Sequence, residues 1–79
     1  MDVRRRVGQN VKQARKAISL SQEALAFECG LHRTYISGVE RGVRNPTVTV
    51  LEKIAGALKV PTSQLLEEPH LRAPVVSPH

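Results

Sequence analysis

The chain has 79 residues, of which 41% are hydrophobic and 3% aromatic, and twelve Lys and Arg against seven Asp and Glu give a formal net charge of +5. A chain of this length forms one small core, which excludes two domains and argues against a deep catalytic cleft. The one cysteine, Cys29, cannot form an internal disulfide, and no Cys/His cluster has the spacing of a zinc site. The absence of a long apolar segment argues against a membrane span or a secretory signal, so we expect a cytoplasmic protein.

The positive charge is concentrated near the N-terminus. Residues 1–18 contain Arg4, Arg5, Arg6, Lys12, Arg15 and Lys16 against one acid, Asp2, whereas basic and acidic residues balance in the rest of the chain. A basic segment of this kind is typical of proteins that bind nucleic acid. A solvated helix face would explain it equally well, so the charge alone does not decide the function.

Apolar spacing and capping residues predict two helices in the first part of the chain. The first covers about residues 3–18, because apolar residues recur there at intervals of three and four, namely at Val3, Val7, Val11, Ala14 and Ile18. Ser21 is a favourable N-cap for a second helix over 22–29. Gly30 suits the left-handed position that ends such a helix.

A third helix is predicted over 33–40, with Ile36 and Val39 on its inner side and Gly42 beyond its end. It is separated from the second helix only by the tight turn at Gly30. Two short helices joined by a glycine turn, in a basic all-helical chain, are the arrangement of a helix-turn-helix. In that motif the second helix enters the major groove of DNA.

Two more helices complete an all-α, compact five-helix domain. The fourth covers about 48–59 and begins either after Thr47 or at a capping box that starts with Thr49. A short fifth helix over 63–67 is capped by Thr62. The prolines that follow predict a flexible C-terminal tail. The predicted domain therefore spans residues 1–67, and the tail spans residues 68–79.

The outward face of the third helix is polar, basic and small, and consists of Arg33, Thr34, Ser37, Gly38 and Arg41. An arginine can bind guanine through two parallel hydrogen bonds, and a threonine can offer its methyl or its hydroxyl to a base edge. We therefore expect Arg33 and Thr34 to contact bases and Ser37 to contact DNA beside them. A glycine at position 38 would let the helix backbone approach the duplex, unless it is merely tolerated there.

The order and spacing of several short segments match a known pattern. They are Val11-Lys12, Arg15, Ser21-Gln22-Glu23-Ala24-Leu25-Ala26, Gly30-Leu31, Ile36-Ser37, Glu40-Arg41-Gly42, Pro46-Thr47, Leu51, Ile54-Ala55 and Leu58-Lys59-Val60. In these segments the chain resembles the phage repressor and Cro-like (XRE-type) helix-turn-helix regulators, whose domain is lambda-repressor-like. Residues 33–41 are most similar to the controller proteins of restriction-modification systems. The resemblance implies a sequence-specific, DNA-binding transcriptional regulator.

The resemblance also implies roles for individual side chains. Gln22 would contact phosphate and support the recognition helix, and Tyr35 would either donate its hydroxyl to a phosphate or pack over the core edge. Arg41, Arg44 and Asn45 lie where the family approaches the DNA backbone. Arg15 and Glu40 match an arginine and a glutamate that many members pair beneath the recognition helix, a structural role. His32 departs from the pattern, because members usually have a better N-cap, such as Ser or Thr, at its position.

Specificity favours a homodimer, because one short helix recognises few bases whereas two copies related by a two-fold axis recognise a (pseudo)palindromic operator in double-stranded DNA. Leu65 and Leu66 are the candidate interface residues, although either could instead complete the core. The alternative function is a protein-interaction module or antitoxin-type adaptor, against which the basic recognition face argues. An enzyme or an RNA-binding protein is disfavoured, because no catalytic constellation and few aromatic residues are present. We expect no cofactor, metal or small-molecule substrate.

Overall fold

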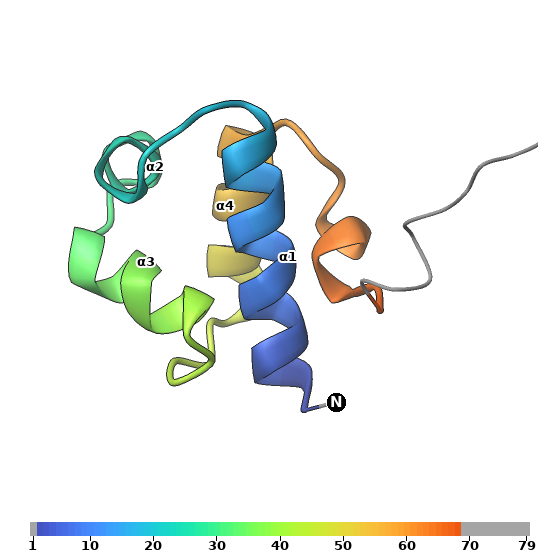
Figure 1. Cartoon of the computed structure of the whole chain (residues 1–79). Coiled ribbons are helices and arrows are strands. Elements are labelled where there is room, and N and C mark those ends of the chain that lie inside the picture. The colour runs from blue at the N-terminus through green and yellow to red at the C-terminus, as the bar shows by residue number, and fades with distance from the viewer. Residues whose placement is uncertain (1, 69–79) are drawn as a thin grey trace, which may run out of the picture.

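A computed structural model describes residues 2–68 of the chain. It contains α1 (Val3–Ala17), α2 (Gln22–Cys29), α3 (Arg33–Glu40), α4 (Val48–Leu58) and a 3₁₀ helix, η1 (Thr62–Leu66) (Figure 1). No strand occurs within residues 2–68, so the predicted all-α class is confirmed. The four α-helices agree with prediction to within one residue, whereas the fifth element is a 3₁₀ turn and not an α-helix.

Side-chain caps account for where three of the α-helices begin. The capping oxygens accept N–H groups two or three residues onward: Asp2 from Arg4 at 2.7 Å, Ser21 from Ala24 at 3.0 Å and Thr47 from Val50 at 3.2 Å. Ser21 therefore caps α2 as predicted, and Thr47 rather than Thr49 begins α4. The predicted cap at Thr62 is wrong, because Pro61 occupies the position before η1 and no side chain caps that turn.

All four α-helices end in the same type of reversal. A residue with positive φ follows each one, and the next N–H bonds to the carbonyl five residues earlier, as in a Schellman motif. The left-handed residues are Ser19, Gly30, Gly42 and Lys59, and the bonds join Leu20 to Arg15, Leu31 to Ala26, Val43 to Gly38 and Val60 to Ala55. The chain therefore turns sharply after each helix, which keeps α2 and α3 close together.

The core lies around α1, which contacts α3, α4 and η1. Figure 1 shows α1 and α4 in the middle of the molecule, with α2 and α3 on one side and η1 on the other. The predicted stripe of α1 is buried from Val7 to Ala14, and Ile36 and Val39 of α3 are fully buried opposite it. Helix α3 therefore faces the core with the side that its sequence predicts.

The C-terminal end of the described chain is attached to α1 by polar contacts that the sequence analysis did not identify. Asn10 is fully buried, and its Nδ2 donates to the carbonyls of Leu65 at 2.9 Å and Glu67 at 2.7 Å. Arg6 Nη1 donates to Glu68 Oε2 at 2.7 Å. Glu68, assigned to the tail from the sequence, is thus paired with α1. The remainder of the predicted tail, with His70 and His79, lies outside the described residues.

The backbones of α1 and α3 meet directly at Gly8, a second feature that the sequence analysis missed. A Cβ added at Gly8 would collide with the carbonyl oxygen of Val39 and would lie 2.7 Å from that of Glu40. Both atoms belong to the backbone at the end of α3, so neither can move without shifting the helix. Only glycine at position 8 allows this close approach.

We predict opposite effects for two glycine-to-alanine changes. Gly8→Ala is expected to lower the free energy of unfolding by about 1–3 kcal/mol, because the added methyl overpacks the contact between α1 and α3. Gly56→Ala is expected to raise it by about 1 kcal/mol, because nothing lies within 4 Å of the added Cβ and alanine is the better helix former. Denaturant unfolding of both variants measures the difference. Equal effects in the two variants would contradict the close packing at Gly8.

Candidate nucleic-acid interface

The exposed face of α3 presents the side chains that the sequence predicts. Arg33 and Thr34 are exposed in the first turn, and Ser37 lies half-buried one turn onward. Because Ile36 and Val39 anchor the opposite side in the core, the exposed face cannot rotate inward without exposing aliphatic surface. In helix-turn-helix proteins the N-terminal residues of the second helix contact base edges.

A buried ion pair lies beneath this face. Arg15 Nε donates to Glu40 Oε2 at 2.6 Å, and Arg15 Nη2 donates to Glu40 Oε1 at 3.0 Å, so the guanidinium and the carboxylate form two parallel bonds. The side chains are only 10% and 3% exposed. The hydrogen bonding that Arg15 donates to Glu40 raises the pKa of Arg15 above its usual value. The predicted pairing of Arg15 with Glu40 is therefore present.

Two further hydrogen bonds extend this pair to the start of α2. Gln22 Nε2 donates to Glu40 Oε1 at 3.0 Å, and Arg15 Nη1 donates to the carbonyl of Leu20 at 2.8 Å. The network thus joins the end of α1, the segment before α2, the first residue of α2 and the last residue of α3. Of the two roles expected for Gln22, the support of the recognition helix is present in this geometry.

The loop after α3 lies close to the exposed face of that helix. Arg41, Arg44 and Asn45 are exposed, and the central guanidinium carbon of Arg44 lies 5.5 Å from the ring centroid of the half-buried Tyr35. This distance is within the range of a cation–π interaction. Arg44, a cation of the loop, therefore lies over the aromatic ring of α3 itself.

The predicted role of Gly38 is wrong. Gly38 is buried, and the side chain of Arg44 lies over it, with Arg44 Cγ 2.6 Å from where a Cβ would stand. The physical reason is the reversal at Gly42, which returns the loop onto α3 and covers the position that the helical pattern alone leaves facing solvent. The glycine therefore accommodates the chain's own arginine and does not present bare backbone to a duplex.

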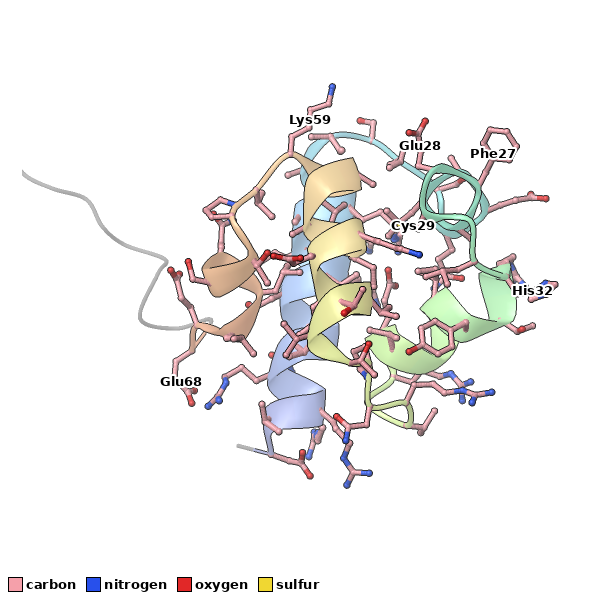
Figure 2. The ribbon with its side chains drawn as sticks, turned by 180° about the vertical axis from the view of Figure 1, so that it is seen from behind. Phe27, Glu28, Cys29, His32, Lys59 and Glu68 are labelled. Atoms are coloured by element: carbon pink, nitrogen blue, oxygen red, sulfur yellow. The ribbon has the colours of Figure 1, made fainter. Side chains whose placement is uncertain are left out.

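Helix α3 begins at Arg33 as predicted, although its cap is poor. His32 occupies the N-cap position with extended backbone, but its side chain makes no capping hydrogen bond. The side chain is exposed at the edge of the molecule (Figure 2). The carbonyl of His32 accepts from the N–H groups of Tyr35 and Ile36, so the backbone and not a side chain closes the first turn of α3.

The remaining candidates separate into core and surface residues. Cys29 is buried, with Sγ 3.7 Å from the carbonyl of Lys53, and burial raises the pKa of its thiol. Leu65 is fully buried in the core, so the prediction that it lines a dimer interface is wrong, whereas Leu66 is 42% exposed.

In the part of the chain from 2 to 68, no His, Cys, Asp and Glu side chains cluster as a metal site would require. None of the helices there has the length and apolarity to cross a bilayer.

The fold and its basic exposed face define a helix-turn-helix DNA-binding domain. The family model for helix-turn-helix proteins, HTH_3, matches residues 11–65. The chain belongs to this family.

Known relatives and solved structures agree with the family. The control protein C.BamHI of Bacillus amyloliquefaciens is 52% identical over 67 residues, which cover 84% of this chain and 83% of that protein. The crystal structure of the restriction-modification controller protein C.AhdI from Aeromonas hydrophila is 44% identical, with a TM-score of 0.76 over 78% of this chain and 90% of the other. A structure of the biofilm regulator SinR in complex with DNA is 37% identical, with a TM-score of 0.74 over 77% and 98% of the two chains. The protein is a sequence-specific DNA-binding transcriptional regulator, similar to the restriction-modification controller proteins.

We predict that the buried network stabilises the fold strongly. Glu40→Gln removes the charge that compensates Arg15 and places an amide donor among donors, so it is expected to lower the free energy of unfolding by about 3–5 kcal/mol. Asp2→Asn is the matched control, because it makes the same chemical change in the exposed pair between Asp2 and Arg4 and because Asn also caps helices. The unfolding midpoint of Asp2→Asn should equal that of the wild type. Equal midpoints for all three proteins in thermal unfolding would disprove the importance of the network.

Proposed function

We propose that the protein binds a (pseudo)palindromic operator as a homodimer, with α3 of each protomer in the major groove. The observation that carries this proposal is the orientation of α3, whose first turn exposes Arg33 and Thr34 while its aliphatic side is fixed in the core. A helix held in this way can enter a groove without rearrangement. Such a regulator acts where the DNA is, in the cytoplasm.

The contacts divide into base recognition and backbone positioning. Arg33 binds guanine O6 and N7, and Thr34 and Ser37 contact neighbouring base edges. Phosphates are bound by polar side chains at the start of α2, on α3 and in the loop after α3, namely Gln22, Tyr35, Arg41, Arg44 and Asn45. The proximity of Tyr35 and Arg44 in the monomer supports their inclusion in one surface.

Dimerisation supplies the specificity that one short helix lacks. Two protomers related by a two-fold axis would place their α3 helices about 34 Å apart, the length of one helical turn of DNA. Leu66 is the remaining candidate for the interface, because it is exposed on η1 while Leu65 belongs to the core. Burial of Leu66 against its symmetry mate would stabilise the dimer through its apolar surface.

Selection of bound duplexes from a random pool tests base recognition. The Arg33→Ala variant is expected to lose base preference at one symmetric pair of positions, by about 1–3 kcal/mol, and to keep its salt dependence. Arg44→Ala should weaken binding evenly across sequences and flatten the salt dependence by about one unit of slope per protomer. An unchanged preference in Arg33→Ala would refute its assignment to a base.

Sedimentation measurements test the interface. Leu66→Gln is expected to shift the protein toward monomer and to reduce operator affinity, while the protomer stays folded because the side chain is 42% exposed in it. Phe27→Gln is the control, because Phe27 is 84% exposed on α2 and lies on the opposite side of the molecule from Glu68 (Figure 2). Dimers of normal stability in the Leu66 variant would place the interface elsewhere.

A further inference from the structure

The buried glycine of α3 has no role in the core. Glycine in the middle of a helix is less favourable than alanine, so a structural or functional reason for Gly38 is required. The atoms nearest to an added Cβ all belong to the loop after α3: Arg44 Cγ at 2.6 Å, Arg44 Nε at 3.5 Å and Val43 Cγ2 at 3.5 Å. The space above Gly38 is therefore occupied mainly by the stem of Arg44, with the side chain of Val43 next to it.

The same glycine also fixes the loop backbone. Its carbonyl accepts hydrogen bonds from the N–H groups of Val43 at 2.9 Å and Arg44 at 3.2 Å. The Cα of Arg44 is thus held against α3, and the side chain continues over Gly38 to Tyr35, which lies one helical turn toward the N-terminus. The guanidinium therefore lies over the ring of Tyr35, against the side of α3, and not at the tip of the loop.

We propose that Gly38 is a positioning residue for DNA binding, which orders the Arg44 side chain across α3 before the duplex arrives. The inference rests on the proposed function and adds how one cation of its contact surface, Arg44, is held in place. Within residues 2–68 the guanidinium of Arg44 makes a cation–π contact with Tyr35 and no hydrogen bond or ion pair, so its N–H donors are available for phosphate or a base edge. An arginine already ordered in this way loses less side-chain freedom on binding than one that extends freely from a loop.

Gly38 differs from Gly8 in what a methyl group would displace. At Gly8 the obstacle is backbone, whereas at Gly38 it is the flexible stem of Arg44, which can swing away into solvent. Gly38→Ala is therefore expected to fold with unchanged or greater stability, because alanine favours the helix, while it removes Arg44 from Tyr35. Stability and DNA affinity should thus change in opposite directions, which a merely structural glycine would not produce.

A double-mutant cycle on the full chain tests the proposal. The four proteins are the wild type, Gly38→Ala, Arg44→Ala and the double variant, each titrated at several salt concentrations with the duplex that the wild type selects. Gly38→Ala is expected to lower affinity roughly tenfold per half-site, the size of one lost charge-assisted contact, and to flatten the salt dependence as Arg44→Ala does. In the double variant the loss should equal that of Arg44→Ala alone. Wild-type affinity in Gly38→Ala, an additive loss or a lowered unfolding midpoint would each overturn the proposal.

A measurement without DNA separates this inference from the proposed function. The ring of Tyr35, the only tyrosine of the chain, should shift the NMR signals of the Arg44 side chain in the wild type and not in Gly38→Ala. Tyr35→Phe should keep the shift and Tyr35→Leu should abolish it, which tests the contact between Arg44 and Tyr35 independently of the Gly38 variant. Absence of the shift in the wild type would overturn the positioning role. If the shift is present but no duplex is selected, the proposed function fails while the ordering of Arg44 stands.

Discussion

The buried bond between Arg15 and Glu40 is the interaction on which the rest of the structure depends. Burying two charges costs desolvation energy, which is offset only where the geometry is good and the remaining donors are satisfied. Both conditions hold, because the guanidinium and carboxylate bond in parallel and Leu20 and Gln22 complete the set. The network therefore contributes to which arrangement of α1, α2 and α3 forms, as well as to how stable that arrangement is.

The recognition helix is accordingly fixed from two directions. Apolar burial of Ile36 and Val39 sets its rotation about its own axis, and the polar network together with Gly8 sets its position relative to α1. Apolar packing tolerates small shifts, whereas parallel hydrogen bonds and a direct backbone contact do not. Helix α3 has only eight residues, and its own intrahelical hydrogen bonds are too few to make it rigid, so it needs this support from the rest of the domain.

The sequence predicts features that depend on local rules. Helix bounds, the caps at Ser21 and Thr47 and the inner face of α3 follow from spacing and side-chain chemistry, and the ion pair follows from resemblance to a family. The environment of Gly38 does not follow, since it depends on the path of a loop after the helix. Leu65 and Leu66 could not be distinguished, because a 3₁₀ turn orients neighbouring side chains differently from the expected α-helix. Asn10 looks like one more polar residue of a basic helix, and nothing in the sequence marks its two backbone partners.

The attachment of η1 to α1 has a consequence for how such a domain can be extended. Asn10 and Arg6 secure residues 65–68 on the side of α1 opposite to α3 (Figure 1). A segment or domain joined after Glu68 therefore starts on the side of α1 away from α3, which is the proposed DNA-binding helix. A sensory module or a reporter joined there would lie away from the DNA contacts of its own protomer but close to Leu66, so it would act on DNA binding through the proposed dimer interface and not through α3.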